Sequence, residues 1–443
     1  MFKYKTKFKN ATKSSIFLLT FALSWAAESP TESKEKDLKK VLEEQGIYVE
    51  TSKPGIKLSG YVDAGYSYNF TGRDTAQVTR GANDGQNATE SGGDFNLYNF
   101  KLTLEKALPE ENTWSAGFRT DLNYGEDALL KTGNAASDSV SSLWLQQAYV
   151  NFNIPVGNGL QIKLGKWSAL TGFEAPERPA NPNISGGLVA TLEPGEHVGL
   201  LGTYSLNKNF TFNLGIANAD WGNNADGVSV LDGSGNSNVL YTGSLQFGNS
   251  AKTLCSKFIV VSNPYGGSGI LSSTNPAGAA NQVINEGESL LFNHNTVWTP
   301  KCCNDKLMLG YNTLLGFYNN YAHAPVGSSP RDYNESYWGL AGYAKYIFND
   351  LFSLAQRIEY ISCDDGAKFG QNGSALTAPN LNGKKSEAFG FTTTVGFNLW
   401  DNMLLRAEYR ADFTHVNDPS GAASANGDET VTHLAIAEVV YSF

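Results

Sequence analysis

Charged residues of opposite sign alternate at a spacing of two in the C-terminal part of the chain. Two segments carry this pattern, LLRAEYRAD with Arg406, Glu408, Arg410 and Asp412, and SLAQRIEY with Arg357 and Glu359. Alternate residues of a β-strand point to the same face of a sheet, so each set lines one face. Guanidinium and carboxylate groups placed in this way can pair with one another or bind a polar solute. A ladder of ion pairs that stiffens the sheet is favoured, and a solute-binding ladder stays open.

The segments that carry these residues alternate between apolar and polar side chains, which predicts β-strands with one apolar and one wet face. Sixteen such strands are predicted, at 56–70, 95–107, 112–124, 142–154, 159–166, 197–206, 209–218, 238–248, 252–262, 288–299, 306–318, 336–348, 351–362, 387–399, 402–414 and 430–443. The ninth alternates poorly, so its register is open. Most are long enough to cross a bilayer at a tilt.

Short and long connections between these strands alternate strictly along the chain. The long ones are 71–94, 125–141, 167–196, 219–237, 263–287, 319–335, 363–386 and 415–429. Short periplasmic turns and long extracellular loops are typical of outer-membrane barrels. In lipid a sheet must close so that every backbone amide is paired. The fold predicted is an all-β, transmembrane, antiparallel up-and-down β-barrel of about 16 strands.

Composition narrows the class of protein further. Charged residues make up 17% of the 443 residues, below the roughly 25% of ordinary soluble proteins. No run of 18 apolar residues occurs, which excludes a helical membrane protein. The formal net charge of −10 and the lack of long basic runs argue against nucleic acid as a partner.

The two ends of the chain predict export to a bacterial outer membrane. Residues 1–26 have the layout of a signal peptide, with five lysines before an apolar stretch and small residues at the cleavage site. Residues 27–54 are polar with one short helical patch and are expected to be a periplasmic segment before a barrel domain at 55–443. The terminal Phe443 resembles the signal that the outer-membrane assembly machinery recognises.

A barrel of this size is too wide for side chains to fill, so water occupies the lumen. The sequence therefore predicts a porin, a channel for passive diffusion of small hydrophilic solutes and ions. Two alternatives stay open: a solute-specific channel, and a non-conducting surface adhesin or structural barrel. Outer-membrane lipid is the expected surrounding, and five tryptophans near strand ends are expected to form its interfacial girdles: Trp114, Trp144, Trp298, Trp338 and Trp400.

The stretch from Gly165 to Leu200 resembles the OmpL-like family of β-barrel porins. The resemblance rests on four short elements: Gly165-Lys166-Trp167, Gly172-Phe173-Glu174, Asn181-Pro182, and Pro194 to His197 followed by Val198-Gly199. SGYVDAGYSYNF, SLAQRIEY and LLRAEYRAD also look like the family, so that the resemblance covers most of 56–443. This chain departs from it at Ser185-Gly186-Gly187, where members often carry Ser-Arg and an aromatic residue. A pore-lining arginine is therefore expected to be missing.

The third long loop, 167–196, is expected by analogy with general porins to fold into the lumen and narrow it. Its charged residues are Glu174, Glu177, Arg178, Glu193 and Glu196. Rings of charge set ion preference in such pores. On the wall, Arg119 and Asp121 join the two charged ladders as candidate constriction residues. A solvated outer loop is the alternative, and a trimer is expected by the same analogy.

Charges predicted to face the lumen nearly balance. The basic positions are Lys57, Lys101, Arg119, Lys163, Lys257, Lys345, Arg357, Arg406 and Arg410. The acidic ones are Asp63, Glu105, Asp121, Glu359, Glu408, Asp412 and Glu438. This balance does not predict strong ion selectivity.

The four cysteines allow a disulfide but do not predict one uniquely. Cys255 begins the ninth predicted strand, and Cys302 and Cys303 follow the tenth, at the same end of neighbouring strands. A bond from Cys255 to either is geometrically possible and suits an oxidising periplasm. Cys363 is expected at the extracellular rim.

Motifs typical of enzymes and metal sites are absent from the sequence. The five histidines are scattered, neither H-E-x-x-H nor G-x-S-x-G occurs, and Gly165-Lys166 lacks the spacing of a phosphate loop. We therefore expect no catalysis, no metal and no cofactor. A barrel lipase stays an alternative, because it needs only a serine and a histidine near the rim.

Overall fold

The structure is a computed structural model, and it describes ten stretches of the chain. These are residues 55–71, 92–128, 143–218, 239–264, 267–271, 282–286, 288–323, 331–364, 385–417 and 429–443. The predicted signal peptide, 1–26, and the segment 27–54 lie outside them. Within the described stretches, no helix has the length and the apolar character needed to cross a membrane.

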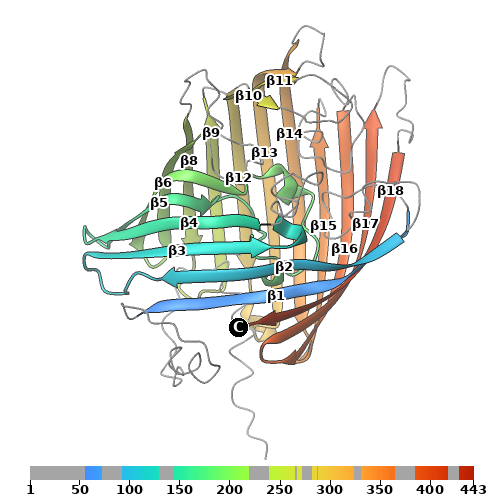
Figure 1. Cartoon of the computed structure of the whole chain (residues 1–443), viewed down its shortest axis with the longest axis horizontal. Coiled ribbons are helices and arrows are strands. Elements are labelled where there is room, and N and C mark those ends of the chain that lie inside the picture. The colour runs from blue at the N-terminus through green and yellow to red at the C-terminus, as the bar shows by residue number, and fades with distance from the viewer. Residues whose placement is uncertain are drawn as a thin grey trace, which may run out of the picture.

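Antiparallel strands make up most of the described chain (Figure 1). They are β1 (Ile56–Asn69), β2 (Gly92–Lys106), β3 (Ser115–Tyr124), β4 (Leu143–Ile154), β5 (Leu160–Ser168), β6 (Glu196–Asn207), β7 (Phe210–Asn218), β8 (Val239–Gly248), β9 (Leu254–Asn263), β10 (Gly267–Leu271), β11 (Gln282–Glu286), β12 (Glu288–Trp298), β13 (Leu307–His323), β14 (Arg331–Ile347), β15 (Phe352–Cys363), β16 (Lys385–Trp400), β17 (Met403–Asn417) and β18 (Glu429–Ser442). Three short 3-10 helices are η1 (Arg178–Ala180), η2 (Val189–Leu192) and η3 (Lys301–Cys303).

The sheet closes on itself into a barrel. β1 pairs with β2 on one side and with β18 on the other, and the two backbone hydrogen bonds between Gly60 and Phe443 extend that seam to the last residue. β9 pairs directly with β12, so the β10–β11 hairpin stands outside the ring. Of eighteen described strands, removing these two leaves sixteen in the ring. The predicted fold class and strand number are confirmed.

Residues 263–287, predicted as a long loop, contain the β10–β11 hairpin. The two strands pair with each other, and β11 also pairs with the end of β13 at Ile284 and Asn285. β13 and β14 are also longer than predicted and pair with each other out to His323 and Arg331. Backbone pairing therefore extends the wall beyond the amphipathic part of the strands, at the end where Figure 1 shows the hairpin.

The barrel has its apolar side chains on the outside and polar ones inside. Leu214 and Ile358 are 73% and 51% exposed on the outer face, whereas Asp63 and Asn312 are fully buried on the inner face. Strand alternation produces this separation, since successive side chains point to opposite faces. Lipid covers the exposed apolar band in a membrane barrel.

Trp144 corrects one expectation about the aromatic girdles. Four of the five tryptophans lie exposed on the surface, but Trp144 is only 4% exposed and packs against Ala128 inside the barrel. β4 has a β-bulge at Gln146, opposite Asp121 and Leu122 of β3, and the bulge shifts the register between the two strands. The shift places both Gln146 and Gln147 on the inner face and reverses the alternation beyond them.

The lipid-facing assignment makes a direct prediction for stability. Replacing the outward Ile358 by arginine is expected to destabilise the folded barrel by about 2–4 kcal/mol, because a guanidinium near the middle of a strand meets hydrocarbon. The same change at Phe348, in the turn after β14, should cost about 0–1 kcal/mol because it lies near the interface. Urea titration in lipid vesicles measures both values, and equal costs would contradict the assignment.

Candidate functional site

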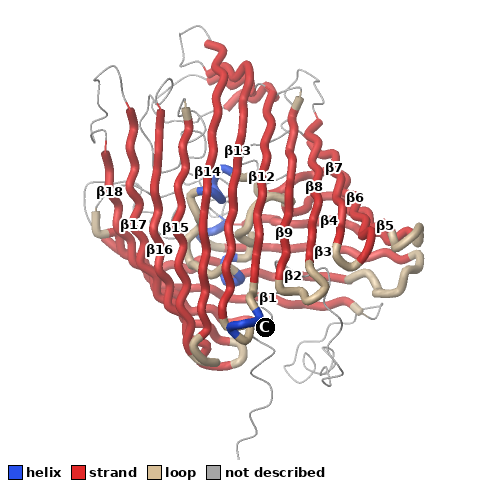
Figure 2. The backbone as a smooth tube through the Cα atoms, turned by 180° about the vertical axis from the view of Figure 1, so that it is seen from behind, coloured by secondary structure: helices blue, strands red, loops and turns tan. Residues whose placement is uncertain are grey.

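Residues 169–195, between β5 and β6, form a loop that lies inside the barrel, and we call this segment the inner loop. Figure 2 shows its short helices η1 and η2 surrounded by strands. Its two ends meet at the wall, where the amide of Ala169 donates to the carbonyl of Gly195 at 2.9 Å. The inner loop therefore leaves and rejoins the wall at one place.

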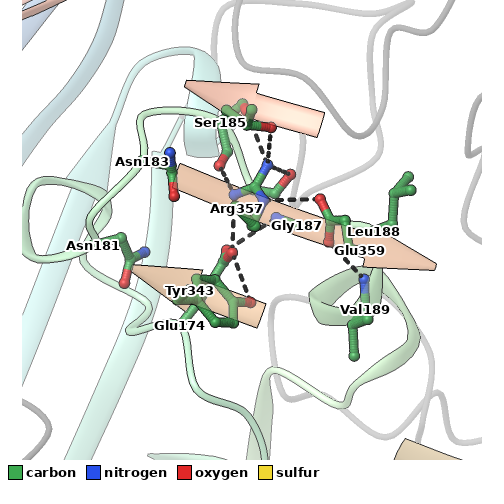
Figure 3. A network of polar contacts seen from close by, with 12 residues as sticks. Glu174, Asn181, Asn183, Ser185, Gly187, Leu188, Val189, Tyr343, Arg357 and Glu359 are labelled. Atoms are coloured by element: carbon green, nitrogen blue, oxygen red, sulfur yellow. Dashed lines mark hydrogen bonds and ion pairs between the residues drawn. The ribbon is translucent and has the colours of Figure 1, made fainter. Parts of the chain in front are cut away.

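Arg357 on β15 is the centre of the contacts between the wall and the inner loop (Figure 3). Its guanidinium is fully buried and donates to the carboxylate of Glu359 at 2.8 Å and to that of Glu174 at 3.0 Å. It also donates to the carbonyl oxygen of Ser185 at 2.7 Å. Charge-assisted bonds of this kind are about twice as strong as neutral ones. One wall arginine thus holds two separate parts of the inner loop.

The β17 ladder binds the same turn of the inner loop from the neighbouring wall. The carboxylate of Glu408 accepts the amides of Ile184 at 2.5 Å and Ser185 at 2.9 Å. Arg410 donates to the carbonyl of Gly186 at 2.5 Å and to Asp412 at 2.7 Å. The backbone groups of this turn would otherwise be buried without partners, which is costly.

Arg406 fixes the preceding part of the inner loop. It forms an ion pair with Glu438 of β18 and donates to the carbonyl oxygens of Asn181 at 2.6 Å and Arg178 at 3.3 Å. The ladder is therefore a set of ion pairs whose remaining donors hold the loop backbone.

A second charged cluster holds the inner loop to the wall formed by β2 and β3. Lys101 lies 2.5 Å from Glu177 of the loop and 3.2 Å from Asp121. Arg119 pairs with the same two carboxylates, at 3.5 Å and 3.0 Å. Because β2 and β3 lie on the other side of the β18–β1 seam from the ladder, the inner loop bridges two parts of the wall.

Neutral contacts attach the inner loop at β12, β13 and β14. The side-chain Nδ2 groups of Asn293 and Asn312 donate to the same carboxylate oxygen of Glu193, at 3.0 Å and 2.9 Å. Phe173 stacks on Tyr343, with ring centroids 3.9 Å apart. The inner loop is thus attached at more than half of the barrel circumference.

Apolar packing adds a core inside the lumen. Leu188, Val189 and Leu192 of the inner loop pack with inward-facing wall residues that include Leu240, Val261 and Leu291. Burying one such side chain contributes about 1.5–3 kcal/mol. This core explains the poor alternation of the ninth predicted strand, because β9 needs apolar residues on both faces, lipid outside and the inner loop inside.

Two glycines lie where the inner loop passes the charged cluster. A Cβ atom on Gly187 would lie 2.7 Å from a carboxylate oxygen of Glu174 and 2.8 Å from one of Glu359. Beside Gly186, the guanidinium of Arg178 fills the space that a side chain would need. Gly186 and Gly187, where this chain departs from the family pattern, thus leave room for these charged side chains.

Glu193 gives the inner loop a pH dependence. Burial, with a smaller contribution from the neighbouring Glu174 carboxylate, raises the pKa of Glu193 to about 8. A raised acid pKa means that the folded state holds a proton that the unfolded state releases near 4.5, so stability falls as pH rises from about 4.5 to 8. We expect a lower unfolding temperature at pH 9 than at pH 6, and a smaller difference in Glu193→Gln. An unchanged difference in the variant would contradict this role.

The structure brings together the residues singled out in the sequence, but most of them do not face open water. The ladder residues Arg357, Glu359, Arg406, Glu408, Arg410 and Asp412 are at most 5% exposed. The inner loop covers them, and their role in a constriction stays a prediction. Glu174, Glu177, Glu193, Arg119 and Asp121 lie in the contacts described above. Arg178 contributes its carbonyl, and its guanidinium forms no ion pair among the described residues.

Several residues that attach the inner loop were missed from the sequence. They are Asn293, Asn312, Tyr343 and Thr394. Each faces the inside of its strand, and that alternation was the available signal. Nothing local marks which of many inward polar residues meets a loop from a distant part of the chain.

The cysteines do not form the disulfides that the spacing allowed. None of the four cysteines forms a disulfide, and Cys255 is buried in the wall while Cys302 is exposed in η3. The sulfur atoms of Cys302 and Cys303 are 3.4 Å apart without a bond. Within the described part of the chain, no group of three or more His, Cys, Asp or Glu side chains could hold a metal ion.

Comparisons with known proteins agree with this architecture. Residues 55–443 match the family described as "Putative beta-barrel porin-2, OmpL-like". The outer membrane channel DcaP of Acinetobacter baumannii has a similar structure, with 13% identity, a TM-score of 0.57, and coverage of 89% of this chain and 99% of that one. OprB of Pseudomonas putida has 11% identity and a TM-score of 0.52, with 92% and 96% covered. No curated protein matches. The chain belongs to the OmpL-like β-barrel porin family, whose members are outer-membrane barrels.

Proposed function

We propose that this porin is a passive channel through which small hydrophilic solutes and ions cross a bacterial outer membrane, and that the inner loop sets its narrowest part. Membership of a porin family and a closed sixteen-strand ring support the channel. The buried attachment of the inner loop at Arg357 supports the constriction. A loop held by several charged contacts keeps one position, so the size of the opening is a fixed property of the fold.

The observation that carries the proposal is the position of the inner loop inside a lumen that water would otherwise occupy. A barrel of this strand number is wider than its own side chains can fill. One loop attached along the wall narrows the lumen but leaves part of it open to water. The same observation would suit a blocked barrel if the apolar core around Leu188 and Val189 extended across the whole lumen.

Planar-bilayer recording separates these two cases. The purified full chain is expected to insert and produce discrete, uniform conductance steps. A protein that inserts, as judged by protection of its strands from protease, but never produces steps would contradict the channel and favour a structural or adhesive barrel.

Four further features belong to the proposal. We infer that residues 1–26 direct export and are removed, and that Phe443, half-exposed at the end of the closing seam, is the assembly signal. A homotrimer is expected by analogy with sixteen-stranded porins, and chemical cross-linking in the membrane tests it. Transport through a fixed opening requires no catalysis, so we expect no enzymatic activity.

A further inference from the structure

The charged residues inside the barrel fall into two regions that differ in net charge: the contacts around the inner loop, and the wall on its periplasmic side. In the contacts around the inner loop, acidic and basic side chains neutralise one another, as in Arg357 with Glu359 and Arg406 with Glu438. The carboxylates of Glu174, Glu177 and Glu408 are also bound by donors. Because these charges are buried and paired, they contribute little net electrostatic potential to the open part of the lumen.

The inner wall on the periplasmic side of the inner loop is different. Lys257 lies near the start of β9, beside the short turn 249–253, and Lys345 lies near the end of β14, beside the turn 348–351. Both are half-buried and face the lumen. Neither forms an ion pair with a carboxylate of the described residues.

The register places both lysines just below contacts of the inner loop. On β14, Tyr343 contacts the loop, and Lys345 is the next inward residue toward the periplasm. Lys257 is opposite Asn295 on β12, which is one inward position below the loop contact Asn293. The two ammonium groups therefore belong to the same zone of the lumen, directly after the constriction.

A third lysine, Lys163, lies in the same zone but interacts electrostatically with Glu105 of β2. Lys163 is on β5, with its ammonium 4.7 Å from the ring centre of Tyr149. The other inward residues of the periplasmic half of β5 to β14 are neutral where the structure describes them, and include Thr203, Asn213 and Ser244. The nearest acidic wall residues are on β2 and β3, where they pair with Arg119.

We propose that Lys257 and Lys345 form an anion-binding wall at the periplasmic exit of the constriction, so that the channel prefers small anions such as carboxylates and inorganic phosphate. The proposal rests on the channel function proposed above and adds its charge selectivity. Fixed charges without fixed counter-ions raise the local concentration of mobile ions of opposite sign. Amide and hydroxyl neighbours can bind the oxygen atoms of an anion alongside the ammonium groups.

The range of this effect depends on salt in a way that can be measured. The screening length is about 10 Å at 0.1 M salt and about 3 Å at 1 M. Lysines on the wall therefore act across a loop-narrowed lumen in dilute salt and much less in concentrated salt. Anion preference should weaken as the salt concentration rises, whereas selectivity by size alone should not.

Reversal potentials in a KCl gradient test the proposal on the full chain in planar bilayers. The wild-type channel is expected to prefer chloride over potassium. The variant Lys257→Glu/Lys345→Glu should lower the chloride-to-potassium permeability ratio by at least about twofold, because charge on a pore wall sets ion preference. If reversed charge prevents folding, Lys257→Gln/Lys345→Gln is expected to shift the ratio in the same direction by less.

A matched control carries the same change of charge outside the lumen. Lys208→Glu/Lys301→Glu alters two exposed lysines in periplasmic turns and should leave the reversal potential close to that of the wild type. Conductance steps with cation preference, or with equal shifts in both double variants, would overturn the anion-binding wall and leave the channel intact. The absence of any steps would remove the channel function and this inference together.

Discussion

Replacing residues 172–192 by a short Gly-Ser linker is expected to raise the single-channel conductance by at least about twofold, because pore width and lining control conduction. The removed segment carries η1, η2 and most of the inner loop. The ring itself should persist, because β5 and β6 keep their own pairing from Leu160 to Ser168. Planar-bilayer recording of the purified variant gives the conductance directly.

The β10–β11 hairpin supplies a matched control for this deletion. Residues 267–286 are similar in number to the removed segment, but the hairpin stands outside the sixteen-strand ring. Its replacement by the same linker should leave the conductance near the wild-type value. An unchanged conductance in the 172–192 variant would show that the inner loop does not limit flow.

Arg357→Ala is expected to have the largest effect of any single substitution on both stability and conductance. Removing this guanidinium leaves the carboxylates of Glu174 and Glu359 buried without their cation. Breaking one side of a buried ion pair typically costs about 3–5 kcal/mol. We expect a loss of this order in the free energy of unfolding, together with noisier and larger conductance steps as the inner loop moves.

Two further variants separate this role from a general effect of lost charge. Arg357→Lys keeps the charge but has three donors in place of a planar fork, so it should recover only part of the stability. Lys385→Ala removes an exposed partner of Glu387 and should leave the stability close to that of the wild type, because exposed ion pairs contribute little. Equal losses in Arg357→Ala and Lys385→Ala would contradict the attachment role.

The ring of strands could be predicted from the sequence because membrane strands repeat a simple local pattern. Apolar residues face lipid at every second position, and the sixteen predicted segments coincide with the sixteen strands of the ring. The two exceptions have identifiable physical causes. β9 is apolar on both faces because it packs against the inner loop, and the bulge at Gln146 reverses the faces around Trp144.

The inner loop could be singled out, but its contacts could not. Alternation showed that Arg406 and Glu408 share the inner face of one strand, which left ion pairing and solute binding as alternatives. The choice depends on whether another segment covers them, and the residues that do so are more than 200 positions away, as in the contacts of Ser185 with Glu408. Contacts of that range depend on the register of the whole ring.

The same reasoning explains why the net charge of the inward-facing wall residues was a poor guide to ion selectivity. Counting inward residues gave nearly equal numbers of acids and bases. The structure separates those that neutralise one another beneath the inner loop from Lys257 and Lys345, which have no carboxylate partner among the described residues. Selectivity follows from the charges that stay accessible to water, and pairing decides which ones do.

Swelling of liposomes that contain the purified chain, with neutral sugars of increasing size, tests the central claim most directly. A water-filled opening narrowed by the inner loop predicts rapid swelling with the smallest sugars and a steep decline as the sugar grows. Liposomes that hold the folded barrel yet exclude even the smallest sugar, at the same rate as protein-free liposomes, would contradict it.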